Sequence, residues 1–432
     1  MTASALAARF RGVRAASRAL LRGLSPEDCA AQSMPDASPA KWHLAHTTWF
    51  FETFVLEAHE PGFAPSQPAY RALFNSYYQA IGAPFTRAKR GLLTRPSLDD
   101  VQHWRNDVDA RIERLLDGAD AAQFAAVAPL IELGLQHEQQ HQELIVTDVK
   151  HLLAQNPLAP AWNLTLPTRE AVAASTASAP ADATAGRTAF AAARANSAAA
   201  PPPTERRWIR RPAGIVEIGH GGPGFAFDNE APRHRVFLEA HALASHCVTA
   251  GEYLDFIRAG GYAQSQWWLA EGWDWIRREA IAHPLYWIAP GADAATAADG
   301  WREFTLAGTR PLDGAAPVCH LSGYEADAYA RWAGARLPTE AEWEAAATAQ
   351  PDAFADLAGA VWQWTASGYS PYPGFRPDAG AVGEYNGKFM VNQYVLRGGS
   401  IATPPGHARP TYRNFFPASA RWQFTGLRLA RD

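Results

Sequence analysis

One stretch of biased composition divides this chain of 432 residues into two dissimilar parts. Residues 157–206 are dominated by Ala, Pro, Ser and Thr, and no periodic apolar face runs through them. Such a segment cannot bury enough apolar surface to fold by itself, so we expect a linker. The predicted organisation is therefore a first domain over 1–156, the linker over 157–206, and a second domain over 207–432.

The first part has the pattern of a helix bundle. Apolar residues recur at spacings of three and four, and long helices are predicted within 39–59, 101–118 and around 133–144. The Arg-rich residues 1–22 could be taken for an organelle transit peptide, but their apolar residues also fall at helical spacing, which favours an ordinary first helix. Four long helices make a bundle, whose interior suits metal ligands that project from facing helices.

The second part is predicted to be an α+β domain. Short strand-like pieces such as "YVLRGGSIATP" alternate with Gly-Pro punctuation, and helical stretches are expected around 249–258 and 322–333. Its irregular segments are long enough to build a pocket, and we expect that pocket between the bundle and this domain.

Composition excludes several classes of function. A formal net charge of -4 supplies no broad basic field for nucleic acid or an anionic membrane, so a small molecule is the expected partner. No apolar run approaches the roughly 18 residues of a membrane span. Cys29, Cys247 and Cys319 are too few and scattered for a disulfide framework, which indicates a reducing, cytoplasmic setting.

The stretch "LGLQHEQQHQEL" contains the H-E-x-x-H pattern of zinc proteases as His137, Glu138 and His141. Residues four apart on a helix lie on one face, so both imidazoles can reach one cation. However, the sequence that follows has neither the third His of metzincins nor the downstream Glu of thermolysin-like enzymes. A protease is therefore a poor interpretation.

A better third ligand lies upstream in "WHLAHTTWFFE". His46 is on another predicted helix of the same bundle, among aromatic residues that would bury a neutral imidazole, and His43 on that helix could replace it. Each histidine alone is more readily explained as an ordinary core or surface residue. Together, three neutral nitrogens without a carboxylate favour a metal with open coordination positions, which suits zinc hydrolysis or iron that activates oxygen.

These motifs, followed by "RLPTEAEWE", "VWQWTAS", "RGGS" and "YRNFF", resemble the EgtB-type sulfoxide synthases of ergothioneine biosynthesis, in the branch with an adjacent Tyr-Tyr pair. The resemblance covers nearly all of the chain outside the linker. It implies a DinB-like four-helix bundle followed by a C-type-lectin-like, formylglycine-generating-enzyme-like domain. It also implies that His46, His137 and His141 hold Fe(II), and that the sulfur of cysteine or γ-glutamylcysteine is joined with O2 to imidazole C2 of Nα-trimethylhistidine.

Substrate-binding residues follow from the same resemblance. Gln140 and Asn414 would hold the trimethylhistidine carboxylate, and Phe415 and Phe416 would offer ring faces to its quaternary ammonium. Core packing explains the Phe pair equally well.

The stretch "FNSYYQAIGAPFTRAKRGLLTRP" carries the other implied roles. Tyr77 and Tyr78 would donate a proton or an electron during oxygen reduction, while Arg87 and Arg90 would pair with the carboxylate of the sulfur donor. A solvated basic face is the alternative for the arginines. Actinobacterial members grip a γ-glutamyl group with Asp and Arg where this chain has Phe416 and Ala420, so free cysteine is the expected donor.

Other functions remain open at this point. A formylglycine-generating enzyme needs a late cysteine pair, which this chain lacks after "RGGS", so Cys247 and Cys319 are expected to be buried apolar fillers. An ovothiol-type synthase usually carries a methyltransferase domain, and no such domain is expected in this sequence, which ends at Asp432. A zinc-dependent DinB-like thiol transferase and a non-enzymatic carbohydrate-binding module are further alternatives. In the synthase interpretation Glu138 lies on the helix surface or beside the ligands, with no general-base role. The oligomeric state is not indicated.

Overall fold

A computed structural model of the chain describes residues 1–162, 164, 206–291, 300–377 and 380–432. The chain divides into two compact units. The first comprises Met1–Leu164, Leu306–Gly308 and Asp378–Tyr385, and the second comprises Thr165–Thr305, Thr309–Pro377 and Asn386–Asp432. Most of the expected linker lies outside the described residues.

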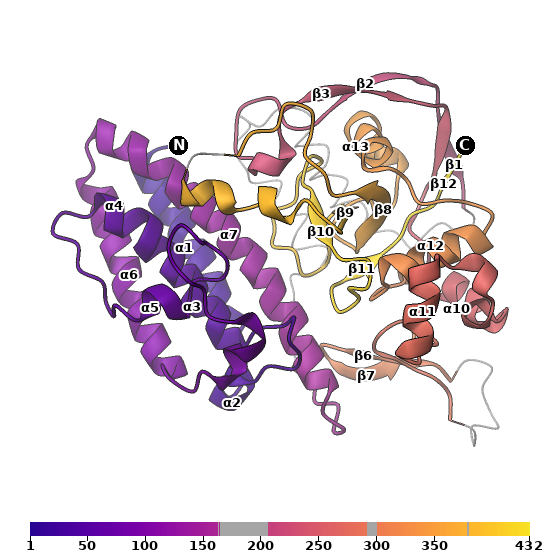
Figure 1. Cartoon of the computed structure of the whole chain (residues 1–432), viewed down its shortest axis with the longest axis horizontal. Helices are drawn as coiled ribbons and strands as arrows, with labels where there is room; N and C mark the ends of the chain where they lie inside the picture. Colours follow the sequence, from indigo (N-terminus) through magenta and orange to yellow (C-terminus); the bar gives the residue numbers. More distant parts are fainter. Residues whose placement is uncertain (163, 165–205, 292–299, 378–379) are drawn as a thin grey trace. The chain divides into compact units, whose positions relative to one another are not determined.

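In the part of the first unit that the structure describes there are four long helices, as predicted: α1 (Ala3–Ala19), α3 (Ala40–Phe51), α6 (Leu98–Gly118) and α7 (Ala121–Ala154). Helices α1 and α3 each pack against both α6 and α7 (Figure 1). The α3 helix continues through a π-helical turn (Glu52–Leu56) into α4 (Glu57–His59). Shorter pieces are α2 (Pro26–Ala30), α5 (Tyr70–Leu73) and a 3-10 helix (Arg87–Leu92).

Local sequence explains where these helices begin and which faces they bury. The α6 helix starts at a capping box in which Ser97 and Asp100 bond each other's backbone N–H groups, and α7 starts at Asp120, whose side chain caps Gln123. Every residue of α3 is buried, which explains its weak apolar periodicity. Gly134 of α7 permits the close approach of α3, because a Cβ there would lie 2.5 Å from the ring of Phe51.

The second unit contains small sheets, as expected for an α+β domain. The strand orders are β1-β4-β12, β2-β3, β5-β6-β7 and β10-β9-β8-β11. In the last sheet β8, β9 and β10 pair antiparallel, whereas β11 pairs parallel with β8. The strands are β1 (Trp208–Arg211), β2 (Gly214–Ile218), β3 (His234–Leu238), β4 (His241–Ala244), β5 (Trp287–Ile288), β6 (Arg302–Thr305), β7 (Gly308–Pro311), β8 (Trp362–Gly368), β9 (Tyr394–Arg397), β10 (Asn414–Phe416), β11 (Thr425–Gly426) and β12 (Ala430–Arg431).

Among the described residues, four helices accompany these sheets. Both predicted helices are present, as α10 (Ala250–Arg258) and α12 (Gly323–Trp332). Two others were missed, namely α11 (Ala270–Arg278) and α13 (Glu340–Ala349). The α13 helix does carry a start signal, a capping box between Thr339 and Glu342, whereas α11 starts without a side-chain cap.

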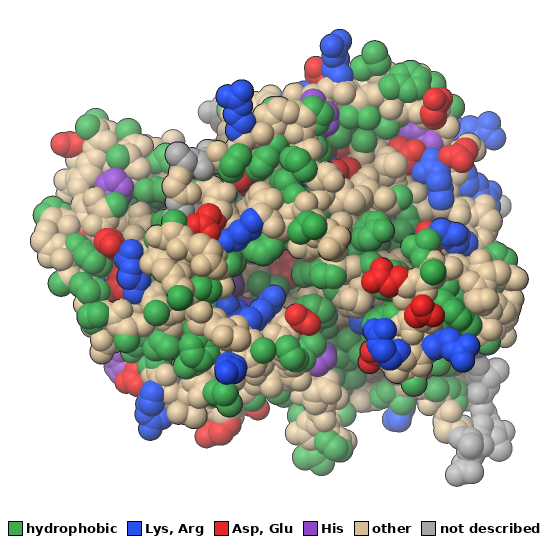
Figure 2. All heavy atoms as spheres, in the orientation of Figure 1, with side chains coloured by type: hydrophobic (Ala, Val, Ile, Leu, Met, Phe, Trp, Pro, Cys, Tyr) green, Lys and Arg blue, Asp and Glu red, His purple; other side chains and the backbone are tan. Residues whose placement is uncertain are grey.

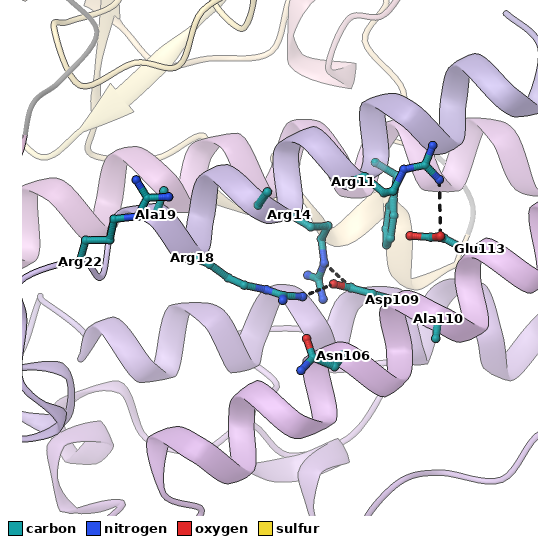
Figure 3. A pocket seen from close by; sticks show the side chains of 11 residues that line it. Arg11, Arg14, Arg18, Ala19, Arg22, Asn106, Asp109, Ala110 and Glu113 are labelled. Atoms are coloured by element: carbon teal, nitrogen blue, oxygen red, sulfur yellow. Dashed lines mark hydrogen bonds and ion pairs between the residues drawn. The ribbon is translucent and has the colours of Figure 1, made fainter.

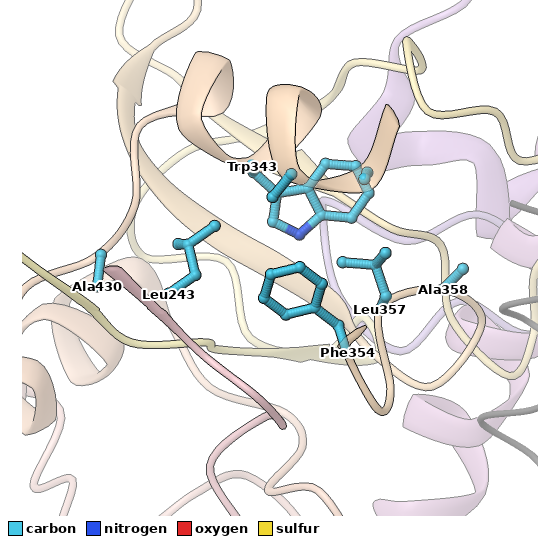
Figure 4. Packing of buried hydrophobic residues seen from close by; sticks show 8 residues of the cluster. Leu243, Trp343, Phe354, Leu357, Ala358 and Ala430 are labelled. Atoms are coloured by element: carbon cyan, nitrogen blue, oxygen red, sulfur yellow. The ribbon is translucent and has the colours of Figure 1, made fainter. Parts of the chain in front are cut away.

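The core of the second unit is centred on α13. Trp343 packs with Phe354, Leu357 and Leu243 in a fully buried apolar cluster (Figure 4). The Trp343 indole N–H donates to the Gln363 side chain at 2.9 Å, so its one polar atom is satisfied. Through this cluster, β4, α13 and the loop that follows α13 pack against one another.

The surface agrees with the near-neutral charge balance. On the face drawn in Figure 2, basic and acidic side chains are interspersed rather than gathered into one basic patch. None of the described helices combines the length and apolar character that crossing a membrane would require.

Candidate metal centre

Three histidines from two helices of the first unit come together. His46 projects from α3, and His137 and His141 project one turn apart from α7. One ring nitrogen of each lies within 4.8 Å of the other two, and all three side chains are buried. The sequence prediction that His46 joins the helical pair is thus matched by the geometry.

The spacing of this group fits one metal ion after a small adjustment. Metal–nitrogen bonds of about 2.1 Å that meet at about 90–120° separate their nitrogens by about 3.0–3.6 Å, so nitrogens 4.8 Å apart must draw together by about 1–2 Å to share an ion. Among the described residues, His46 Nε2 and His137 Nδ1 are buried without a hydrogen-bond partner. Buried polar atoms are normally satisfied, so these two nitrogens are available as ligands.

The protonation of the group suits a metal site. Burial lowers the pKa of His46 and His141 well below the usual histidine range, with neighbouring imidazoles adding to the effect, and burial lowers the pKa of His137 to about 3. Metal binding requires neutral imidazole. The His46 ring is also oriented, because its Nδ1 lies 2.6 Å from the Phe74 carbonyl and must donate to it, which leaves a lone pair on Nε2.

Aromatic side chains around the histidines, called here the aromatic wall, produce this burial. The Trp42 and Trp49 rings stack on His46 with centroids 4.8 and 5.3 Å away, and Phe50 packs against His137 at 4.9 Å. The aromatic-rich surroundings expected for His46 are therefore present.

His43, the alternative third ligand, has a different position. Its Nδ1 lies 2.8 Å from His141 Nδ1, and its Nε2 lies 3.1 Å from Asp148 Oδ2. Both ring nitrogens are engaged, and His43 is absent from the group that surrounds a common point. His46 is therefore the better ligand candidate.

Tyr77 and Tyr78 lie beside the aromatic wall. Their rings stack at 4.5 Å, and the fully buried Tyr78 packs against Trp49 at 5.5 Å. Asn75 fixes this turn, since its side chain accepts from the Tyr78 N–H and donates to the Tyr78 carbonyl, both at 2.9 Å. Burial, reinforced by the Tyr77 hydroxyl, raises the pKa of Tyr78 well above the usual range, so its phenol keeps its proton.

The two candidate arginines differ in environment. Arg90 is 5% exposed, its guanidinium carbon lies 3.3 Å from the centre of the Trp42 ring, and its Nη1 donates to Ser38 Oγ at 2.9 Å. Burial, with Arg87 nearby, lowers the pKa of Arg90 to about 8, and Arg90 Nε has no partner among the described residues. Arg87 is exposed, as a basic surface residue would be.

A segment distant in sequence completes the first unit near Gln140. The Tyr385 hydroxyl donates to Gln140 Oε1, and the Tyr385 ring lies edge-on to His137 at 5.6 Å. The neighbouring Glu384 carboxylate accepts the backbone N–H groups of residues 79 and 80 at 2.9 and 2.8 Å. Sequence reasoning missed Tyr385, because no local pattern reveals a contact with a residue 245 positions away.

Asn414, Phe415 and Phe416 form β10 in the second unit. Phe415 stacks on Tyr369 with centroids 4.1 Å apart, Phe416 lies near Trp422, and the Asn414 side chain accepts the Phe415 N–H at 2.9 Å. All three are partly exposed, so they are not closed core residues. Their substrate-binding role remains a prediction.

Glu138 points away from the histidines into an ion cluster. Its carboxylate pairs with Arg14 at 2.9 Å and with Arg105, and accepts the Ser17 hydroxyl at 2.5 Å. Burial alone would raise the pKa of Glu138, but the two arginines overcome this and lower it to about 2. At 1% exposure Glu138 is not on the helix surface, so the first of the two expected positions was wrong.

The Arg14 side chain in that cluster also reaches a surface groove between α1 and α6. There Arg14 and Arg18 both pair with Asp109, and Arg11 pairs with Glu113 (Figure 3). These arginines are charge-compensated within the helical unit, so we assign them to packing of α1 against α6.

Cys247 is buried, as predicted, but its sulfur lies 3.5 Å from the Asp356 carbonyl and 3.6 Å from Arg428 Nη2, so it is not a purely apolar filler. Cys319 is only partly buried, so the prediction that it is buried was wrong. Cys29 is buried too, and desolvation raises its pKa to about 12, which makes it a poor nucleophile.

Comparison with known families agrees with this architecture. Residues 194–354 and 351–432 match the sulfatase-modifying factor enzyme 1-like domain, and residues 9–145 match the DinB superfamily. The chain therefore belongs to the sulfatase-modifying factor enzyme 1-like family, here combined with a DinB-type helical domain.

The chain is also similar to individual proteins of known name. The chain is 35% identical over 256 residues, 48% of its length, to hercynine oxygenase of Mycobacterium tuberculosis. It is 28% identical over 92% of its length to hercynine oxygenase of Mycolicibacterium thermoresistibile, covering 88% of that protein. It is also 36% identical over 38% of its length to the formylglycine-generating enzyme of Streptomyces coelicolor, covering 52% of it. The match to the Mycobacterium tuberculosis protein spans 56% of that protein's length.

Proposed function

We propose that this protein is an iron(II)-dependent sulfoxide synthase that joins the sulfur of cysteine to imidazole C2 of Nα-trimethylhistidine (hercynine) with O2. The observation that carries the proposal is the buried group of His46, His137 and His141 in a chain similar to proteins named hercynine oxygenase. Three scattered cysteines are too few for a disulfide framework and fit a reducing compartment, so we place the reaction in the cytoplasm.

Three neutral imidazoles with no carboxylate fit Fe(II) that must also accept substrate. His46, His137 and His141 would hold the ion on one side, and their aromatic surroundings exclude water. Bound iron supplies the activation of O2 and positions for a thiolate and an imidazole. The protein would orient the substrates, exclude water from the site and supply protons.

Arg90 is the best candidate to bind the carboxylate of the sulfur donor. A buried guanidinium that keeps one N–H without a partner favours an anion beside it, since an unpaired buried donor costs about 1–3 kcal/mol. Arg87, which is exposed, would act at longer range. Cysteine and γ-glutamylcysteine both present this carboxylate, so the choice of cysteine rests on Phe416 and Ala420, which offer no charged partner to a γ-glutamyl group.

Trimethylhistidine would be held by Gln140, Asn414, Phe415 and Phe416. The two Phe rings are partly exposed, and a ring face in contact with a quaternary ammonium would attract it by about 0.5–2 kcal/mol. Gln140 is already oriented by the Tyr385 hydroxyl. The amide groups of Gln140 and Asn414 offer donors to a carboxylate.

Tyr77 and Tyr78 would supply protons during oxygen reduction. The high pKa of Tyr78 keeps its phenol protonated, and its hydroxyl oxygen lies 3.4 Å from that of Tyr77, close enough to receive a replacement proton. Tyr385 adds a third phenol beside His137.

Anaerobic reconstitution with Fe(II), followed by O2, trimethylhistidine and either cysteine or γ-glutamylcysteine, tests the proposal. Mass spectrometry should detect a cysteine–trimethylhistidine sulfoxide, and NMR should place sulfur at C2. A product linked at C5 of histidine would indicate the ovothiol type. Zinc binding with no O2 uptake would instead support a thiol transferase.

A further inference from the structure

We propose that Asp148 and His43 are positioning residues that fix the tautomer and orientation of His141, so that its Nε2 presents a lone pair to the metal. The inference deepens the proposed function and rests on it. The three side chains form one line of contacts: Asp148 Oδ2 lies 3.1 Å from His43 Nε2, and His43 Nδ1 lies 2.8 Å from His141 Nδ1. All three are at least 91% buried, so water does not compete for these bonds.

The helix geometry produces this line. His141 and Asp148 are seven residues apart on α7, which is about two turns, so they share one face of the helix. His43 enters from α3, which packs against that face. Its ring spans the gap, with one nitrogen directed to each residue of α7.

The direction of each hydrogen bond follows from Asp148, which is at the end of the line away from the candidate ligand His141. Asp148 Oδ2 also accepts the backbone N–H of Ser38 at 2.8 Å, so this oxygen is an acceptor. His43 Nε2 must then carry the proton that it shares with Asp148. In a neutral imidazole the other nitrogen, Nδ1, has a lone pair and can only accept.

The direction of the hydrogen bond between His43 and His141 is thereby determined. His43 Nδ1 accepts, so His141 Nδ1 must donate, and the lone pair of His141 is left on Nε2. A charged His43 would reverse this bond and leave His141 with Nε2–H, which cannot bind a metal.

This arrangement distinguishes His141 from the other two candidate ligands. His46 is oriented by a backbone carbonyl, which no substitution removes. His137 Nδ1 has no partner among the described residues. His141 alone of the three depends on side chains for its tautomer, so its contribution to metal binding can be altered without touching a ligand.

The test compares three variants with the unchanged chain. His43→Leu removes the acceptor, His43→Gln keeps an amide oxygen that can accept from His141 Nδ1–H, and His151→Leu is the matched control. His151 lies on the same helix and bonds Ser33 Oγ at 2.7 Å, away from the three-histidine group. Imidazole ¹⁵N NMR of the metal-free proteins reads the tautomer, and anaerobic titration with Co(II) or Fe(II) reads the affinity.

We expect a single Nδ1–H tautomer for His141 in the unchanged chain and in His43→Gln, and a mixture in His43→Leu. Metal affinity should fall about 10- to 100-fold in His43→Leu, and by less than about threefold in His43→Gln and His151→Leu. An Nε2–H tautomer in the unchanged chain would overturn the inference. So would a folded His43→Gln that loses as much affinity as His43→Leu. Should the unchanged chain bind neither metal, the proposed function fails, while the NMR measurement still decides the tautomer.

Discussion

Tyr77 and Tyr78 lie with their rings stacked at 4.5 Å and their hydroxyl oxygens 3.4 Å apart, and Tyr78 packs against Trp49 of the wall around His46. We predict that Tyr77→Phe or Tyr78→Phe lowers sulfoxide formation by about 10²-fold or more, because a proton donor is lost. Metal binding should survive, since neither hydroxyl belongs to the histidine group. Product analysis and Fe(II) titration measure the two effects separately.

Tyr70→Phe is the control for that pair. Tyr70 packs against Trp104 in the same unit, so its loss should leave sulfoxide formation within about twofold. Loss of iron from both Tyr77→Phe and Tyr78→Phe would contradict the assigned role.

Glu138→Gln tests the alternative use of the H-E-x-x-H motif. Removing one charge from a buried cluster with Arg14 and Arg105 should lower the free energy of unfolding by about 3–5 kcal/mol. Glu132→Gln, on the same helix but partly exposed beside Arg9, should cost less than about 1 kcal/mol. Urea unfolding gives both values. An unchanged stability with lost activity would point instead to a general base.

The metal-free protein should lose stability in mild acid. In the folded chain burial depresses the pKa of His46, His137 and His141, whereas unfolded histidines titrate near 6.5. The unfolded state therefore binds more protons below that pH, and the free energy of unfolding should fall by up to about 2 kcal/mol per histidine between about pH 7 and about pH 5. For His137 the loss continues toward its folded pKa of about 3.

Urea unfolding of metal-free protein across that range measures the slope. His137→Asn removes one titrating group, so about a third of the dependence should disappear with it. A stability that does not vary between these pH values would mean that the three imidazoles are not held neutral.

Arg90 and Arg87 should differ in their effect on the sulfur donor. Arg90→Met should raise KM for cysteine by about 10-fold or more, because the buried guanidinium loses a charge-assisted bond to the donor carboxylate. Arg87→Met, at an exposed position, should change KM by only a few-fold. Steady-state kinetics with cysteine varied at saturating trimethylhistidine compares them. Equal, small effects in both variants would remove the arginines from the donor site.

The helical unit could be predicted well from sequence because its signals are local. Apolar spacing placed the helices that became α3 and α6, and four-residue spacing placed His137 and His141 on one face. His46 was predicted as the third ligand because the aromatic residues of its helix would bury a neutral imidazole inside the bundle, where the other two histidines also lie. These inferences need only the period of a helix and the chemistry of a side chain.

The contacts that orient the site could not be predicted, because they join distant residues. Nothing around Asp148 indicates that it meets His43, and Tyr385 reaches Gln140 from a segment assigned to the other domain by sequence order. The ion cluster of Glu138 was missed because its partners, Arg14 and Arg105, lie on two other helices. Such contacts depend on how neighbouring helices are aligned along one another. This alignment cannot be read from a single sequence.

Anomalous diffraction from crystals grown with Fe(II) without oxygen tests the central claim most directly. Data collected above and below the iron absorption edge should give one strong difference peak, contacted by Nε2 of His46, Nε2 of His141 and one ring nitrogen of His137. A peak held by Glu138 or by other residues, or no peak in crystals that contain iron, would contradict the account.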